Sequence, residues 1–166
     1  MDLAQAEALA LLGDLLARDT AVRFTVTGNS MRPRLMGGTT VLLRRVPPDR
    51  IRRGDLVLCR QPGTLGQRLI LHRVVAIRRC LSGSVLLQTQ GDALAAPDPP
   101  VTGAQVLGRV SAVLGNTPDA EMTDLESRTQ RALALAIALY QRTLWRARSV
   151  YVRFRRLAVS QSTTYP

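Results

Sequence analysis

A serine in a short turn is the first residue of this chain whose setting suggests chemistry. Ser30 lies in the stretch 28–33, Gly-Asn-Ser-Met-Arg-Pro, which follows the alternating stretch 22–27. The alternation predicts a strand that ends at Gly28, because glycine adopts backbone angles closed to other residues. Pro33 has a fixed φ and stiffens the turn. A hydroxyl held on such a turn can act as a nucleophile, although many Gly-x-Ser loops are only turns.

A serine nucleophile needs a base, and the composition leaves one candidate. All 23 basic residues are arginine and His72 is the only histidine, so mechanisms that need a lysine are excluded. His72 lies in the expected strand 69–78, on the face that Ile70 and Val74 share. On an apolar face an imidazole is often a hydrogen-bonded core residue. It can equally accept a proton from a serine near neutral pH.

Two carboxylates could orient this histidine, and the residues themselves do not decide between them. Asp92 and Asp98 lie in the proline-rich segment 90–100, which follows an expected strand. Each could also serve only its own turn, because Asp side chains often bond the backbone of their loop. With Ser30 and His72, either one completes a set for Ser-His-Asp nucleophilic catalysis.

The spacing of apolar and turn residues predicts the elements that position these side chains. We expect a mainly β domain over residues 21–115, a small antiparallel barrel or coiled sheet. A helix is expected in residues 1–20, where apolar residues recur at helical spacing. The expected strands, each bounded by turn residues, are 22–27, 39–46, 55–60, 69–78, 84–90 and 105–114.

The C-terminal segment 120–159 has a different character. From Arg131 onward apolar residues recur every three or four positions with arginines between them, and no acidic residue follows Glu126. This pattern predicts a basic amphipathic helix. Such a helix could lie on an anionic membrane surface, pack on the domain or on another subunit, or simply present a solvated charged face.

Charge and composition narrow the class of protein. The net charge of +11 suits an anionic membrane surface, nucleic acid or an acidic partner. Aromatic residues make up only 4% and no recognition motif stands out, so nucleic acid is not expected. We expect Cys59 and Cys80, each in an apolar run, to be free thiols. The single histidine and the two cysteines show no metal-ligand spacing, so no metal or other cofactor is expected.

The N-terminal residues carry acids before and within their apolar part, and no apolar run reaches the length of a membrane span. We therefore expect neither a signal peptide nor a transmembrane helix. The expected location is the cytoplasm or the periphery of the cytoplasmic membrane.

Several short motifs, in their order along the chain, resemble those of the type I signal peptidases. The similarity spans roughly residues 22–114 and is greatest to the branch of archaea, the endoplasmic reticulum and some spore-formers, where histidine replaces the lysine base. The related LexA-like self-cleaving repressors use lysine, which this chain lacks. The motifs are Gly28-Asn29-Ser30-Met31-Arg32-Pro33, Arg53-Gly54-Asp55-Leu56-Val57, His72-Arg73-Val74, Gly91-Asp92 followed by Asp98, and Leu107-Gly108-Arg109-Val110.

The resemblance implies a signal-peptidase/LexA-like catalytic domain and a serine endopeptidase activity on a precursor or leader peptide. It implies that Ser30 is the nucleophile, His72 the general base and Asp98 the catalytic aspartate. The Ser30 backbone N–H is then a candidate oxyanion donor.

Four further residues receive supporting roles from the same resemblance. Asp92 corresponds to a second carboxylate with a structural role, and Met31 and Pro33 would shape the loop and the neighbouring substrate cleft. Gly28 offers no side-chain hydroxyl to the oxyanion site.

The chain also departs from the family pattern. We expect no N-terminal membrane anchor, Ala93 stands where the family has asparagine after Gly-Asp, and the basic C-terminal helix lies outside the family motifs. These departures suggest a soluble or peripherally attached relative that matures a dedicated peptide. The alternative is a non-catalytic module of peptidase-like fold that docks on a membrane or a partner protein through its basic helix.

Overall fold

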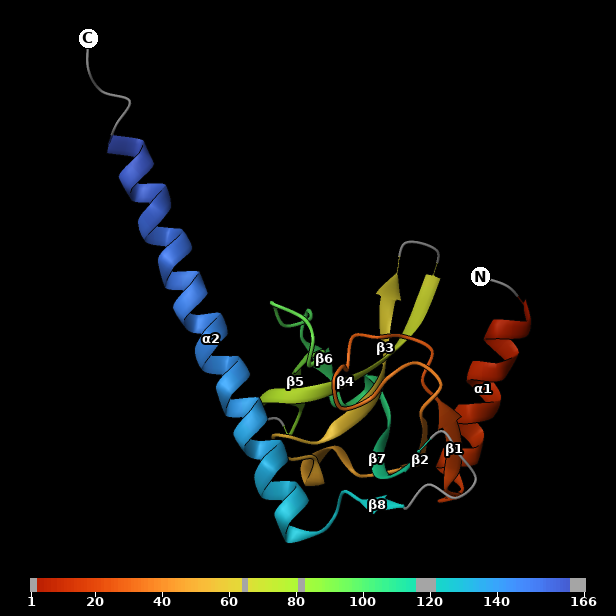
Figure 1. The fold of residues 1–166 in the computed structure, drawn as a ribbon. Helices are drawn as coiled ribbons and strands as arrows, with labels where there is room; N and C mark the ends of the chain where they lie inside the picture. The colour runs from red at the N-terminus through yellow and green to blue at the C-terminus, as the bar shows by residue number, and fades with distance from the viewer. Residues whose placement is uncertain (1–2, 64–65, 81–82, 116–121, 162–166) are drawn as a thin grey trace.

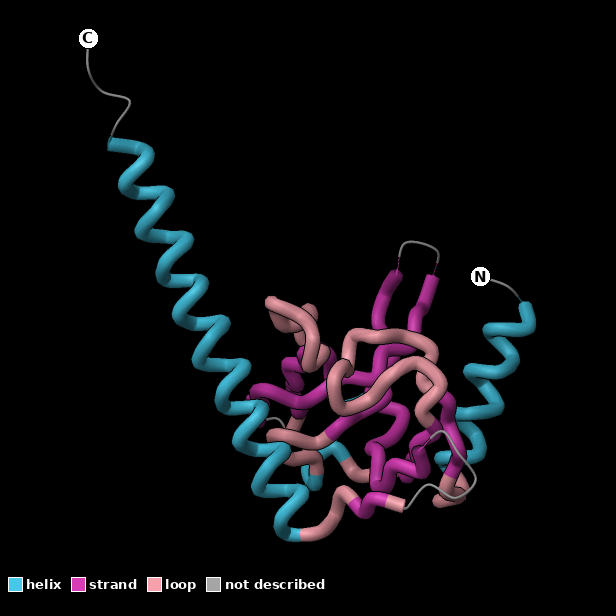
Figure 2. Tube along the Cα trace, in the orientation of Figure 1, coloured by secondary structure: helices cyan, strands magenta, loops and turns pink. Residues whose placement is uncertain are grey.

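One antiparallel sheet forms the body of the protein, as Figures 1 and 2 show. The computed structural model describes residues 3–63, 66–80, 83–115 and 122–161. The strands lie in the order β1-β2-β7-β3-β4-β5-β6, and β8 pairs with β7. They are β1 (Val22–Thr25), β2 (Thr40–Arg44), β3 (Leu56–Gly63), β4 (Gly66–Arg79), β5 (Val85–Gln90), β6 (Val101–Thr102), β7 (Val106–Gly115) and β8 (Thr123–Asp124).

The mainly β class is confirmed, and within the described residues the sheet is open, with β1 and β6 at its two ends, rather than a closed barrel. The six predicted strands correspond to β1–β5 and β7, with their ends shifted by a few residues. The prediction missed β6 and β8, because a two-residue strand carries no alternation. It also missed two 3-10 turns, Pro48–Arg50 and Gly103–Gln105.

Strand β4 separates two clusters of core residues. Leu71 belongs to one cluster, with Leu69 packed against it, whereas Val74 belongs to the other, with Ile70 packed against it. This division follows the alternation of side chains along a strand. The first cluster includes Leu16, Val26, Met31, Leu35, Val41, Leu43, Leu56, Leu58 and Val110, and the second includes Ile51, Val57, Cys59, Val85, Leu87 and Val101.

Two helices flank the sheet on opposite sides of the domain (Figure 1). Helix α1 (Leu3–Ala17) contacts β1 and β7, and helix α2 (Arg128–Gln161) contacts β4. The prediction of a helical tail over 120–159 is wrong at its start, because Thr123–Asp124 pairs with β7 as a strand and the helix begins at Arg128. Residues 120–121 lie outside the described part of the chain. No helix in the described ranges is long and apolar enough to cross a lipid bilayer.

Helix α2 packs on the domain along one face. Ala138 is fully buried and Gln141 is buried, whereas Leu139 and Tyr140 between them are exposed. The helix runs on beyond the sheet toward the C-terminus (Figure 1). Of the interpretations left open for the basic segment, packing on the domain therefore applies to the first half of α2.

Candidate active site

The structure brings together three of the side chains singled out from the sequence. The Oγ atom of Ser30 lies 2.9 Å from Nε2 of His72, and Nδ1 of the same ring lies 2.6 Å from Oδ2 of Asp98. Ser30 precedes β2, His72 lies within β4, and Asp98 follows β5. We call these three residues the serine relay.

The hydrogen bonds in the serine relay define which ring nitrogen carries the proton. A carboxylate only accepts hydrogen bonds, so Nδ1 of His72 must donate to Asp98. The lone pair of Nε2 then remains for the Ser30 hydroxyl. His72 is buried, the Asp98 side chain is largely buried and Ser30 is half-buried, so the imidazole is shielded while the serine end of the relay is partly accessible. This arrangement can remove a proton from the hydroxyl and hold it on the ring.

Asp98 is positioned by a reciprocal pair of bonds with Thr89. The backbone N–H of Asp98 donates to the Thr89 carbonyl at 2.8 Å, and Oγ1 of Thr89 donates to Oδ2 of Asp98 at 2.8 Å. Thr89 is fully buried near the end of β5. Thr89 was not predicted from the sequence; the available signal was a hydroxyl that shares the inward alternation of Val85 and Leu87.

Asp92 contacts a different basic residue. Its carboxylate accepts from Nε of Arg73 at 2.8 Å and from Nη2 at 2.6 Å, and Nη1 of Arg73 donates to the carbonyl of Gly54 at 3.0 Å. Both side chains are buried. Gln141 of α2 adds a bond from Nε2 to Oδ1 of Asp92 at 3.3 Å. We call Arg73 and Asp92 the arginine pair; Arg73 belongs to a motif quoted from the sequence but received no role there, and Gln141 was not singled out.

The turn that holds Asp92 also holds the backbone of the serine. The N–H of Ala93 donates to the Ser30 carbonyl at 2.9 Å. A Cβ added at Gly91 would lie 2.7 Å from that same carbonyl oxygen, closer than real Cβ contacts occur, so only glycine fits. The turn around Asp92 and the turn around Ser30 are therefore in direct backbone contact.

Gly28 does not play the conformational part expected of it. β1 ends at Thr25, although the N–H of Val26 still donates to Thr39. Gly28 is not among the glycines with positive φ, and a Cβ placed on it would meet no atom within 4 Å. The expectation that Gly28 supplies a backbone angle closed to other residues is therefore wrong, and in this region Gly91 is the glycine that packing requires.

The two remaining supporting residues have different surroundings. Met31 is buried in the core cluster beneath the serine turn, so it shapes the loop from below rather than a surface cleft. Pro33 is exposed and borders a groove between this turn and α2. We call it the serine-side groove; its volume is about 530 Å³, and it is lined by Pro33, Arg34, Gln90, Asp92, Ala93, Leu94, Ala95, Ile137, Tyr140, Gln141 and Leu144.

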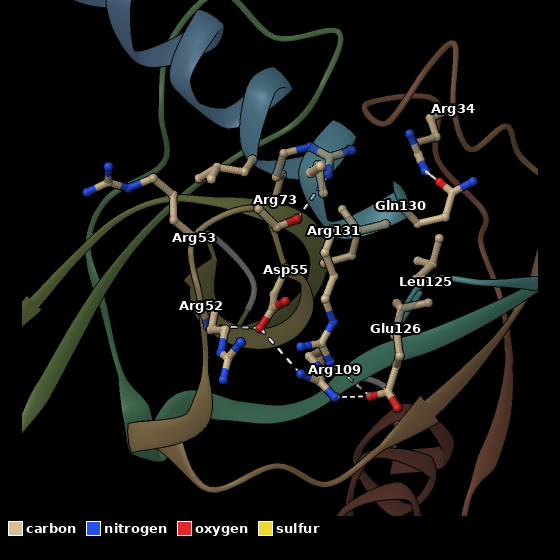
Figure 3. Close-up of a pocket in the computed structure, with 16 residues that line it drawn as sticks. Arg34, Arg52, Arg53, Asp55, Arg73, Arg109, Leu125, Glu126, Gln130 and Arg131 are labelled. Carbon is tan, nitrogen blue, oxygen red and sulfur yellow. Dashed lines mark hydrogen bonds and ion pairs between the residues drawn. The ribbon is translucent and has the colours of Figure 1, made fainter. Parts of the chain in front are cut away.

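A second cavity, of about 340 Å³, lies between the first turns of α2 and the sheet (Figure 3). Figure 3 shows Asp55 between Arg52, whose backbone N–H it binds at 2.8 Å, and Arg109, whose Nη1 lies 3.7 Å away. Burial raises the pKa of Asp55, and these partners oppose that shift. The cavity contains no residue of the serine relay, and Arg34, Arg73 and Arg109 in its lining bond Gln130, Asp92 and Glu126 respectively, so we assign it to the structural framework.

Cys59 belongs to the core cluster on the face of β4 that His72 shares, and both cysteines are free, Cys59 buried and Cys80 half-buried. Burial, with a smaller contribution from the charge of Asp98, raises the pKa of the Cys59 thiol to about 12. Cys59 therefore carries no thiolate at neutral pH and is not a competing nucleophile.

Across the described residues, no group of three His, Cys, Asp or Glu side chains could hold a metal ion.

Comparisons with known proteins leave the site to be interpreted from its own geometry. No protein-family model matches the chain, and no curated protein matches it.

Proposed function

We propose that this protein is a serine endopeptidase that resembles the histidine-base signal peptidases and cleaves a precursor or leader peptide. The observation that carries the proposal is the unbroken hydrogen-bond relay from Ser30 through His72 to Asp98, built from three segments distant in the sequence. A serine held on one imidazole nitrogen and a carboxylate held on the other is the arrangement of serine hydrolases. The order of the motifs along the chain supports the peptidase class among these.

In the proposed mechanism, Oγ of Ser30 attacks the scissile carbonyl carbon as Nε2 of His72 takes the hydroxyl proton. The Ser30 N–H is the proposed donor to the oxyanion. Collapse of the tetrahedral intermediate breaks the C–N bond, and the imidazolium gives its proton to the leaving amine. Water then attacks the acyl carbon, His72 accepts a proton from it, and Ser30 leaves as the free hydroxyl when that proton returns. Asp98 keeps the ring oriented and stabilises its charged form.

The test uses one reactive probe and one substrate set. A fluorophosphonate should label Ser30 in the wild type and fail to label Ser30→Ala or His72→Ala. Synthetic peptides with small residues before the cleaved bond should be cut only by the wild type. Ser111→Ala is the matched control, because the Ser111 hydroxyl donates to the Leu42 carbonyl and has no imidazole partner. Equal turnover by wild type, Ser30→Ala and His72→Ala would overturn the proposal.

A second candidate function is a non-catalytic module that binds an anionic membrane. Helix α2 favours it, because Leu133 and Leu139 are nearly half exposed, and the helix carries Arg128, Arg142 and Arg146 and contains no acidic residue. Exposed apolar and basic residues together suit the interface of anionic bilayers. Flotation with anionic and with neutral vesicles, using wild type and Leu139→Glu, tests it. Equal partition of the two proteins would exclude α2 as the anchor.

A further inference from the structure

The serine-side groove is continuous with the turn that carries the proposed nucleophile. Pro33 and Arg34, which line one wall, belong to the same turn as Ser30, closed by the bond from the Leu35 N–H to the Met31 carbonyl at 3.0 Å. Ala93 lines the groove and binds the Ser30 carbonyl. A peptide seated on Ser30 therefore passes along or beside this groove within a few residues, since an extended chain advances ~3.3 Å per residue.

Helix α2 forms the opposite wall and is fixed in place there. Gln141, which is buried, donates from Nε2 to Oδ1 of Asp92 at 3.3 Å and to the Gly91 carbonyl at 3.5 Å. Gly91 in turn packs against the Ser30 carbonyl. Together with the bond from Arg34 of the serine turn to Gln130 of α2, these contacts fix the position of α2 relative to the serine.

The two long edges of α2 differ in chemistry. Ile137, Tyr140 and Leu144 recur at helical spacing and border the groove, whereas Arg142 and Arg146 border the other side of the helix, next to β4 and β5. Tyr140 is 63% exposed and Leu144 40% exposed, and Leu94 on the facing wall is 42% exposed. Apolar side chains on both walls of an open groove are suited to an apolar ligand group.

The wall also contains hydrogen-bond acceptors without donors. Gln90 and Gln141 both line the groove and are buried, and within the described residues neither side-chain oxygen has a hydrogen-bond partner. Their amide nitrogens are already used, by the Leu94 carbonyl and by Asp92 respectively. Both oxygens are enclosed, so a ligand in the groove reaches them only if the glutamine side chains reorient, and the case for the groove rests on its apolar walls.

We infer that the serine-side groove is a subsite for a bulky apolar side chain of the polypeptide substrate, and that Tyr140 and Leu144 select for it. This inference rests on the proposed endopeptidase function and adds a specificity determinant from a helix that lies outside the peptidase-like motifs. The occupant is the flank of the cleaved chain, because one wall of the groove is the turn of the nucleophile itself.

The experiment uses a degenerate library of short synthetic peptides and identifies the cleaved bonds by mass spectrometry. Wild type should prefer Leu, Phe or Met at one fixed position relative to the cleaved bond. In Tyr140→Ala and Leu144→Ala, kcat/KM for peptides with that residue should fall about tenfold, chiefly through KM. Peptides with Ala at that position should be cut as before. Leu139→Ala is the matched control, since Leu139 is similarly exposed but does not line the groove.

The outcomes separate this inference from the proposed function. Cleavage by wild type with the same preference in both groove variants overturns the subsite and leaves the peptidase intact. If wild type cuts no peptide, binding is tested instead, by selecting peptides from the same library on the full-length protein. Equal enrichment of apolar peptides by wild type and by Tyr140→Ala would overturn the subsite. A concentration-dependent dimer that Tyr140→Ala converts to a monomer would assign the groove to a second copy of the chain instead.

Discussion

His72 and Arg73 are neighbours in β4, and each meets an aspartate from the segment after β5. His72 bonds Asp98 and Arg73 bonds Asp92, both pairs at 2.6 Å in their shortest contact and both largely buried. The two side chains point to opposite faces of the strand, as adjacent residues of a strand must. The same short stretch of sheet thus presents one base–acid pair to each face.

The two pairs differ in what remains free. Arg73 uses Nε, Nη1 and Nη2 in bonds to Asp92 and Gly54, and a guanidinium does not exchange its proton in a reaction. His72 uses only Nδ1 for its aspartate, and its second nitrogen faces the half-buried Ser30. A saturated pair can hold loops in place, whereas a pair with one free nitrogen can move a proton. The difference indicates that the arginine pair supports the turn on which the serine relay depends.

Substitution by asparagine should mainly lower activity at Asp98 and mainly lower stability at Asp92. We expect Asp98→Asn to lower kcat on the order of 10⁴-fold, because an amide no longer holds the ring with its proton on Nδ1. The free energy of unfolding should change far less than in Asp92→Asn. Peptide cleavage and chemical denaturation of both variants measure this. Loss of activity in Asp92→Asn that equals the loss in Asp98→Asn, with both proteins folded, would contradict the division of roles.

For the arginine pair, the expected loss is in stability. Asp92→Asn leaves the buried Arg73 guanidinium without its counter-charge and should lower the free energy of unfolding by about 3 kcal/mol. The double variant Arg73→Met with Asp92→Leu should recover part of this loss, because no unpaired charge is then buried. Urea unfolding of Arg73→Met, Asp92→Leu and the double variant gives the coupling. Additive losses would show that the two side chains do not depend on each other.

The Ser30 and His72 part of the serine relay could be predicted from residue types, whereas the residues alone did not decide between Asp92 and Asp98, and Asp98 was chosen through the family resemblance. One histidine and no lysine left a single base, and alternation placed it on the correct strand. The arginine pair could not be predicted in this way, since 23 arginines offer no reason to choose Arg73. Gly28 was singled out over Gly91 because the contact that demands a glycine joins segments far apart in the chain. The packing of α2 beside the serine turn likewise depends on tertiary contacts that periodicity does not reveal.

The two glycines test whether the two turns are coupled. Gly91→Ala places a Cβ 2.7 Å from the Ser30 carbonyl oxygen and 3.0 Å from the Leu94 side chain, so the serine backbone must shift. A displacement of about 1 Å at a catalytic group can lower the rate ~10²-fold, and overpacking destabilises by about 1–3 kcal/mol. Gly28→Ala is the matched control and should leave both quantities nearly unchanged, because open space surrounds it. Equal effects of the two substitutions on cleavage would show that the Gly91 contact does not position Ser30.

The smallest expected effect concerns Cys59, on the face of the serine relay. Its pKa of about 12, against an ordinary value of 9.0, means that the folded protein keeps this proton longer than the unfolded chain does. Unfolding therefore releases a proton between these values, and this thiol makes the free energy of unfolding fall as the pH rises above 9.0. The free energy of unfolding falls by at most about 1.4 kcal/mol per pH unit from this cause. Measured against pH above 9.0, the free energy of unfolding of Cys59→Ala should lack this contribution.

Alkylation measures the same property directly. In Cys80→Ala, where Cys59 is the remaining thiol, iodoacetamide should leave the native protein unmodified at about pH 8 and react after unfolding, because only a thiolate is reactive. Cys59→Ala, which retains the half-buried Cys80, is the control for reagent access. Native labelling of Cys59 as fast as that of Cys80 would mean that solvent reaches the space beneath His72 and Asp98. The carboxylate would then lack the shielding that distinguishes the serine relay from an ordinary surface histidine.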